Sequence, residues 1–328
     1  MRRSASSNIS EIFVELKSDL DKVFAVIDNE LSDCDKSLTE LIHFPSLHSG
    51  KMIRPALVLL CGSLCGEINQ QHYIAAAVIQ MVHQATLLHD DVIDNAEIRR
   101  GNPTVNILYG NESAILLGDL LLSKALKLAV KLPADFMSRF AATTCDLCQG
   151  ELRQAVEKKN WLVSEEKYFD IISKKSASLF GLCCYCGAAL AQAPQNKIDA
   201  LESFGRNIGI GFQIADDVLD ITGDEKKLGK TLGTDVETNK LTLPVIHLLG
   251  FVSKAQQAKI IESLTNKKKP VDIKWLNQLF EENKSFEYSL EKANQHITQA
   301  VERLDIFEDL QARGFLAKMA HFTIDRLN

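Results

Sequence analysis

Apolar residues recur at intervals of three and four along nearly all of the 328-residue chain. This is the spacing of one buried face on an amphipathic α-helix, and no segment of useful length alternates as a strand would. Only 7 prolines and 17 glycines are available to interrupt the periodic segments, which argues against a sandwich or a barrel. We therefore expect an all-α fold, with long, mostly antiparallel helices packed around a central cavity in a single domain over 1–328.

Turn-forming residues between the periodic segments set the expected helix ends. The segments predict helices at 10–31, 51–65, 70–96, 112–131, 134–159, 164–192, 197–222, 241–250, 254–264, 271–283, 284–303 and 306–327.

The chain carries 37 basic and 43 acidic side chains, for a net charge of −6. This balance provides no general basic surface, so we expect no nucleic-acid partner. The N-terminus has no apolar stretch of signal-peptide length before Glu11, which favours a cytoplasmic location. The longest uncharged segment, 176–196, contains glycine and proline and suits a buried bundle helix better than a membrane span.

Five of the eight cysteines fall into two groups, Cys145 with Cys148 and a cluster of Cys183, Cys184 and Cys186. Together they could suggest a four-thiolate zinc site. Both groups lie in predicted helices, without the turns that zinc knuckles need. We therefore interpret both as small buried side chains in a reducing compartment.

An acidic motif, Asp-Asp-x-x-Asp, occurs twice, at 90–94 and 216–220. Each copy lies at the C-terminal end of a long apolar helix, where the helix dipole already disfavours negative charge. A cation must therefore offset the charge of these carboxylates. On a helix, residues three and four apart share one face, so each motif presents clustered carboxylate oxygens. Oxygen ligands without sulfur suit a hard cation such as Mg²⁺, which is often shared with substrate phosphates. Two facing motifs could hold several Mg²⁺ ions around a diphosphate.

Basic residues accompany both motifs. Lys51 and Arg54 begin a helix, where free backbone N–H groups favour anions, and Arg99 follows the first motif. The set indicates two diphosphate sites and consists of Lys51, Arg54, Arg99, Arg100, Lys175, Lys230 and Lys240.

In order and spacing these motifs strongly resemble the trans-isoprenyl diphosphate synthases, also called polyprenyl synthetases, over nearly the whole chain. The marks of the resemblance are Gly50-Lys51-x-x-Arg54-Pro55, His83, Leu88-His89-Asp90-Asp91-Val92-Ile93-Asp94, Arg99-Arg100-Gly101, Gly118-Asp119, Gln149-Gly150-Glu151, Lys175-Ser176, Phe212-Gln213-x-x-Asp216-Asp217-x-x-Asp220, Gly229-Lys230, Asp235 and Lys240-x-Thr242-Leu243-Pro244.

The resemblance implies a homodimeric enzyme that condenses isopentenyl diphosphate with an allylic diphosphate, using three Mg²⁺ ions per site. Asp90, Asp94 and Asp216 are implied as direct Mg²⁺ ligands. The residues implied to support them or to bind substrate divide into three groups: Asp91, Asp217 and Asp220 around the metal; Arg99, Lys175, Ser176, Gln213, Lys230 and Lys240 at the allylic diphosphate; and Lys51, Arg54, His83 and Arg100 at isopentenyl diphosphate.

The residues below the first motif bear on product length. Ala85 and Thr86 are small where short-chain members of the family tend to be aromatic, which favours a long trans product of about C30 to C50, with octaprenyl the best single prediction. One helical turn, about 5.4 Å, is comparable to one isoprene unit. Deeper residues that could form the floor are Leu121, Leu122, Ala125 and Leu128. Release of so long a product implies transient contact with a membrane.

Three other functions stay open at this point. A short-chain farnesyl or geranylgeranyl diphosphate synthase would share the chemistry. A terpene cyclase of the same fold would usually lack the second acidic motif, and a non-catalytic subunit of a heteromeric synthase would tend to have lost aspartates.

Overall fold

The computed structural model describes residues 4–44, 50–158, 160–222, 240–265 and 273–325. Its elements, in chain order, are α1 (Ser4–Glu15), α2 (Lys17–Leu31), the 3₁₀ turn η1 (Lys36–Leu38), α3 (Thr39–Ile42), α5 (Ile53–Cys65), α6 (Gln70–Ile93), β1 (Ile98–Arg99), β2 (Asn102–Pro103), α7 (Val105–Ala129), α8 (Ala134–Glu157), α9 (Glu165–Ile172), the π-helical turn η2 (Ser173–Ala177), α10 (Ser178–Leu190), α11 (Gln195–Thr222), α14 (Leu243–Phe251), α15 (Lys254–Thr265), α16 (Ile273–Glu282), α17 (Ser285–Glu302), the 3₁₀ turn η3 (Arg303–Ile306) and α18 (Gln311–Asp325).

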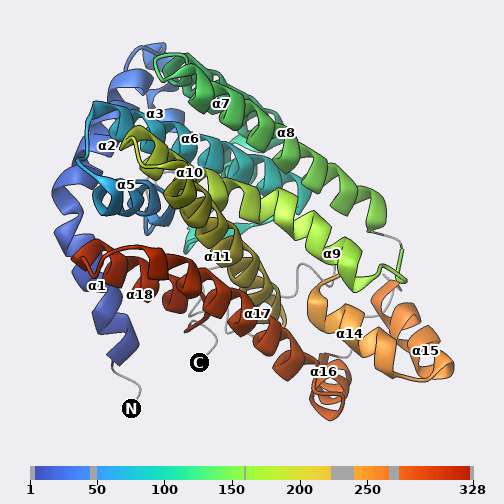
Figure 1. Cartoon of the computed structure of the whole chain (residues 1–328). Coiled ribbons are helices and arrows are strands. Elements are labelled where there is room, and N and C mark those ends of the chain that lie inside the picture. The colour runs from blue at the N-terminus through green and yellow to red at the C-terminus, as the bar shows by residue number, and fades with distance from the viewer. Residues whose placement is uncertain (1–3, 45–49, 159, 223–239, 266–272, 326–328) are drawn as a thin grey trace.

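Helices α10 and α11 run through the middle of the bundle (Figure 1). Helix α10 packs against α5 on one side and α11 on the other, and α11 continues the contact to α17. Helix α6 packs against α7, and α14, α15 and α16 form one end of the molecule. The all-α expectation is confirmed, and within the described residues the extended structure is one antiparallel pair of two-residue strands, β1 and β2.

The two helices that carry the acidic motifs are long. Helix α6 has 24 residues and α11 has 28, which gives lengths of about 36 and 42 Å. Helix α6 starts with a capping box, in which the Asn69 side chain accepts from the Gln71 N–H while His72 Nδ1 accepts from the Asn69 N–H. The first acidic motif therefore lies at the C-terminal end of a helix whose N-terminus is fixed by its capping box.

Two predicted helices are interrupted, and a third begins earlier than predicted. The first divides at Leu16 into α1 and α2, and the one expected at 112–131 begins earlier, at Val105, and kinks at Gly110, where φ is +84°. The helix expected at 164–192 contains the π-helical turn η2 between α9 and α10. Helix α10, which follows the π turn, is buried on nearly every face, so a shift in its register leaves no sign in the apolar pattern.

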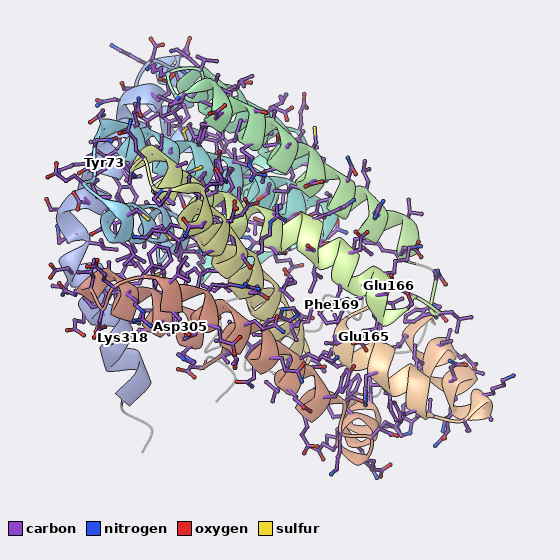
Figure 2. The ribbon with its side chains drawn as sticks, viewed as in Figure 1. Tyr73, Glu165, Glu166, Phe169, Asp305 and Lys318 are labelled. Atoms are coloured by element: carbon purple, nitrogen blue, oxygen red, sulfur yellow. The ribbon has the colours of Figure 1, made fainter. Side chains whose placement is uncertain are left out.

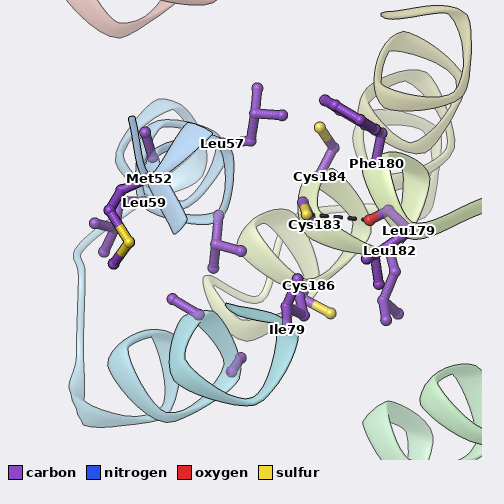
Figure 3. Close-up of a cluster of buried hydrophobic side chains, with 14 of the residues drawn as sticks. Met52, Leu57, Leu59, Ile79, Leu179, Phe180, Leu182, Cys183, Cys184 and Cys186 are labelled. Carbon is purple, nitrogen blue, oxygen red and sulfur yellow. Dashed lines mark hydrogen bonds between the residues drawn. The ribbon is translucent and has the colours of Figure 1, made fainter. Parts of the chain in front are cut away.

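The buried cysteines belong to the core. Cys183, Cys184 and Cys186 on α10 are buried among side chains of α5 and α6, and Cys183 Sγ lies 3.1 Å from the Leu179 carbonyl oxygen (Figure 3). The prediction was wrong for Cys145 and Cys148, which are exposed on α8. They lie on a face of α8 that lacks charge, and the sequence does not distinguish such a face from a buried one. Within the described part of the chain, no three metal-ligating side chains gather into a preformed metal site.

Helix α11 approaches the end of the π-helical turn η2 and the start of α10 closely at Gly209. A Cβ atom added there would lie 2.5 Å from the Cα atom of Ala177. Because that neighbour is backbone, a larger residue would have to push the helices apart.

Among the described helices, none is long and apolar enough to cross a membrane.

We predict that Gly209→Ala lowers the free energy of unfolding by about 1 to 3 kcal/mol, the usual cost of overpacking a close-packed contact. The matched control is Gly314→Ala in α18, where an added Cβ has open space; it should stabilise the fold by roughly 0.5 to 1 kcal/mol. Urea denaturation of both variants measures the difference, and equal midpoints would contradict the close contact.

Candidate active site

A cavity of about 220 Å³ lies where the two acidic motifs meet. Its walls come from α5, α6, the segment that leads into β1, β1 itself, α8, η2, α10, α11 and the segment that enters α14. The lining residues are Arg54, His83, Thr86, Leu87, Asp90, Asp94, Ala96, Ile98, Arg99, Leu147, Glu151, Gln154, Lys175, Ser176, Leu179, Phe212, Gln213, Asp216, Asp217, Asp220, Lys240, Leu241 and Thr242.

The π-helical turn η2 carries Lys175 and Ser176 to the cavity. Its backbone packs directly on α8: a Cβ atom added at Gly150 would lie 2.5 Å from the Lys175 backbone nitrogen. The bulge is therefore held between Gly150 of α8 on one side and Gly209 of α11 on the other. This explains why Gly150, within the predicted Gln-Gly-Glu mark, is a glycine.

Lys175 belongs to a polar group at the centre of the cavity. Its Nζ lies 2.9 Å from Glu151 Oε2 and 2.9 Å from Gln154 Oε1. Burial opposes its charge, but the carboxylates of Asp90 and Glu151 outweigh that effect and raise the pKa of Lys175. Burial, followed by the charge of Asp90, raises the pKa of Glu151. Lys175 is thus a charged cation beside the first acidic motif.

The middle aspartate of each motif is held by the protein. Asp91 is buried, and its Oδ1 accepts a hydrogen bond of 2.6 Å from Arg99 Nε. Burial raises the pKa of Asp91 to about 6 despite that cation. Asp217 is also buried, and its two oxygens accept hydrogen bonds from the Tyr168 hydroxyl at 2.7 Å and from Gln213 Nε2 at 2.8 Å.

Three buried polar atoms of the lining have no hydrogen-bond partner in the described structure: Arg54 Nε, Asp94 Oδ1 and Thr242 Oγ1. The other oxygen of Asp94, Oδ2, contacts Lys240 Nζ. Buried polar atoms are rarely left unpaired, and their gathering at one cavity indicates a polar ligand.

The charge of the lining decides what kind of ligand fits. Six carboxylates and four basic side chains lie among the described lining residues, an excess of two negative charges. A diphosphate cannot enter such a cavity unless further cations accompany it. The carboxylate oxygens, together with the unpaired Oδ1 of Asp94, fit a hard divalent ion that completes its shell with water and phosphate.

Arg54 and His83 form a second polar region of the cavity. The Arg54 guanidinium lies 4.6 Å from the ring centroid of Phe180, and burial lowers the pKa of Arg54 to about 10. Burial and then the charge of Arg54 hold the pKa of His83 well below its usual range. His83 is therefore a neutral imidazole beside a cation, able both to donate and to accept.

The structure brings most of the predicted site residues to the cavity lining. Lys51, Ala85, Asp91 and Arg100 are not among the lining residues. Lys51 is exposed, with its Nζ 4.5 Å from the Phe322 ring centroid, and the Arg100 guanidinium lies against Gly50. Lys230 lies outside the described residues.

The two residues predicted to control chain length, Ala85 and Thr86, lie in different surroundings. Thr86 lines the cavity, whereas Ala85 is completely buried in helix packing. None of the four deeper residues considered as a floor lines this cavity. Its volume is below the roughly 300 to 1,000 Å³ of typical small-molecule pockets, so it suits diphosphate groups and the start of a hydrocarbon chain.

Sequence reasoning gave no role to Gln154 or Tyr168, and Glu151 and Thr242 appeared only as marks of the resemblance. Tyr168 had no signal, because an aromatic residue at helical spacing is typical of a core. The Gln-Gly-Glu mark could have assigned Glu151, since a carboxylate near a predicted cation is a natural ion pair.

Comparison with known proteins agrees with this geometry. Residues 35–282 match the family model described as polyprenyl synthetase. The chain is 35% identical to a short chain isoprenyl diphosphate synthase of Methanothermobacter thermautotrophicus over 84% of this chain and 86% of that one. It is 30% identical to the octaprenyl diphosphate synthase of Haemophilus influenzae over 99% of both chains.

The fold is also similar to a solved structure. A polyprenyl synthase from Caulobacter crescentus, complexed with calcium and isoprenyl diphosphate, superposes with a TM-score of 0.91 at 27% identity, over 99% of both chains. The resemblance, the all-α fold and the class of enzyme expected from the sequence are confirmed. The match of the family model over most of the chain, with relatives that align almost from end to end, shows that this protein belongs to the polyprenyl synthetase family.

Proposed function

We propose that the protein is a Mg²⁺-dependent prenyltransferase that condenses isopentenyl diphosphate with an allylic diphosphate in successive head-to-tail additions. The observation that carries this proposal is the cavity itself, in which two acidic motifs face four basic side chains and three buried polar atoms lack partners. The calcium and isoprenyl diphosphate in the similar Caulobacter structure support a divalent ion and this class of substrate.

Asp90, Asp94 and Asp216 would hold the Mg²⁺ ions, three of them in all, with Asp220 beside them. The ions would supply positive charge that stabilises the diphosphate as a leaving group. Lys175, Lys240 and Arg99 line the same region and would bind the allylic diphosphate. Arg54 and neutral His83, with Lys51 and Arg100 at the edge, would bind isopentenyl diphosphate.

The reaction follows from this charge arrangement. The allylic C–O bond breaks, the electron pair leaves with the diphosphate, and an allylic carbocation remains. The double bond of isopentenyl diphosphate then attacks the cation, and a proton passes from the new adduct to the released diphosphate. Each cycle adds five carbons, and the chain supplies orientation and charge rather than a dedicated general base.

We propose a long all-trans product, about C30 to C50, with octaprenyl as the best single value. Thr86 supports this because a small side chain at the wall leaves room for an elongating chain. The relatives named above include both a short chain synthase and an octaprenyl synthase, so a short product is the alternative. Release of a long product would need an apolar acceptor such as a lipid surface. A location in the cytoplasm stays a prediction.

We also propose that the chain folds as one domain and acts as a homodimer. Helices α1 and α18, from the two ends of the chain, pack against each other. More than half of the large exposed apolar side chains of the described residues lie within 107–156, on α7, α8 and the turn between them. Leu152 and Val156 of α8 are 67% and 78% exposed. Such a surface is typical of an interface between copies.

The test of the proposed reaction is incubation with Mg²⁺, labelled isopentenyl diphosphate and farnesyl diphosphate, with products resolved by length. We predict that Asp90→Asn lowers kcat by about 100-fold or more, because a charge needed at the leaving group is lost. Asp309→Asn, at an exposed position remote from the cavity, is the control and should match the wild type. Full turnover by the Asp90 variant would refute the assignment.

Product length is tested at the cavity wall. Thr86→Phe should shorten the main product by at least one isoprene unit, because the ring would occupy the space beside the first acidic motif. Ala85→Phe should instead destabilise the fold, since Ala85 is completely buried. Chromatography of the products and thermal denaturation separate the two effects. A Thr86 variant with unchanged products would show that the chain takes another path.

The proposed dimer predicts that Leu152→Glu shifts the protein from the mass of two chains to the mass of one, because a charge would be buried in the interface. Val14→Glu, at a position 76% exposed on α1, is the control and should leave the mass unchanged. Light scattering coupled to size-exclusion chromatography measures both. A dimer that survives Leu152→Glu would place the interface elsewhere.

A further inference from the structure

Tyr168 is a buried residue of α9 whose hydroxyl reaches the second acidic motif. Only 3% of the residue is exposed, and its hydroxyl donates to Asp217 Oδ2 at 2.7 Å. Tyrosine hydroxyls are buried when a partner compensates their desolvation, and a charged acceptor makes the strongest such bond. The ring alone would pack equally well as phenylalanine, so the hydroxyl is explained by Asp217.

The same carboxylate ends a chain of hydrogen bonds from the π-helical turn. Ser176 Oγ lies 2.5 Å from Gln213 Oε1, and Gln213 Nε2 lies 2.8 Å from Asp217 Oδ1. An amide oxygen only accepts, so the Ser176 hydroxyl must donate to it. The amide N–H of Gln213 then donates to the Asp217 carboxylate. Both oxygens of Asp217 are therefore fixed by the protein, each from a different element.

We propose that Tyr168 is a positioning residue, which acts through Asp217 to set the second acidic motif for divalent metal and diphosphate. This inference rests on the proposed function and deepens it. Asp216 and Asp220, on either side of Asp217, have their carboxylates at the cavity. Holding the middle carboxylate fixes the last turns of α11 and keeps one negative charge in place before any ligand enters.

Contacts between α9 and α17 hold Tyr168 in place. Its ring lies 5.5 Å from the ring of Phe169, which in turn lies 5.7 Å from the His296 ring on α17. Glu165, one turn earlier, accepts from the Tyr288 hydroxyl of α17 at 2.7 Å. Figure 2 shows Glu165 and Phe169 on α9 where it meets the C-terminal helices. Helix α9 is thus anchored on α17 while Tyr168 reaches the acidic motif.

The chain of hydrogen bonds also couples two parts of the site. Ser176 follows Lys175 directly, so the element that presents the cation is tied to the element that presents the aspartates. A change at Tyr168 should therefore alter how the site binds metal and diphosphate together, more than how it binds isopentenyl diphosphate.

The test is titration calorimetry of inorganic pyrophosphate, with and without Mg²⁺, on the full-length chain. Tyr168→Phe should weaken Mg²⁺-dependent pyrophosphate binding by about 10-fold, the usual scale for residues that orient metal ligands. Binding without Mg²⁺ should change less than about 2-fold. In turnover assays kcat should fall and the Mg²⁺ concentration for half-maximal activity should rise, with little change in KM for isopentenyl diphosphate.

Tyr288→Phe is the matched control. It removes a hydroxyl that donates to a carboxylate over the same 2.7 Å, but Glu165 does not line the cavity. It should lower the melting temperature without changing Mg²⁺-dependent pyrophosphate affinity. If both variants weakened that affinity equally, the effect would be a general loosening of α9 and the proposal would be wrong.

The double variant Tyr168→Phe with Asp217→Asn tests whether the tyrosine acts through the aspartate. The proposal requires that Tyr168→Phe adds no further loss of affinity once Asp217 is changed, whereas additive losses would overturn it. If Tyr168→Phe does not fold, Gln213→Leu removes the other bond to Asp217 and should give the same non-additive loss. These binding results stand apart from prenyl transfer: a wild type that binds Mg²⁺ and pyrophosphate without turnover would refute the proposed reaction but not the role of Tyr168.

Discussion

An excess of negative charge among the residues that line one cavity is the constraint on which the rest of the structure depends. Two helices direct aspartates into one space from their C-terminal ends, where the backbone dipole adds to the repulsion. The protein offsets this cost with ion pairs: Arg99 with Asp91, Lys240 with Asp94, and Lys175 with Glu151. Each pair lies at least half inside the protein, so removing one partner would leave an uncompensated charge. The bundle must therefore hold several elements in place around carboxylates that repel one another.

Glycine residues at two helix contacts allow the close packing that holds these elements in place. Gly150 and Gly209 bring α8 and α11 against the backbone of the π-helical turn from two sides. The irregular turn places Lys175 at the cavity, where its ammonium meets Glu151 beside the first acidic motif.

The sequence predicted the parts of the structure that repeat. Apolar spacing located α6, α8 and α11 to within a few residues, and the paired acidic motifs located the cavity. What it missed depends on a single register or on tertiary surroundings. The π turn was missed because α10, which follows it, is buried on nearly every face and hides a shift in register. Tyr168 was missed because a tyrosine beside a charge and a tyrosine in a core look alike in sequence, and the exposure of Cys145 and Cys148 because residue type does not reveal which uncharged helix face is covered.

The ion pairs also bear on how ligands would enter under the proposed function. Three basic side chains that could bind a diphosphate, Arg99, Lys175 and Lys240, are already paired with carboxylates. Arg54 Nε, in contrast, lacks a hydrogen-bond partner in the described structure. A diphosphate alone would strip cations from buried aspartates, and a metal alone would leave those cations facing each other. If both entered, the carboxylates would exchange lysine and arginine for divalent ions, and the freed cations would move to phosphate oxygens. Under the proposed function each ligand would therefore raise the affinity for the other, and thermodynamic linkage would make that coupling reciprocal. Asp217 accepts hydrogen bonds from two neutral donors, Tyr168 and Gln213, and these bonds would keep the end of α11 in place while the ion pairs around it change.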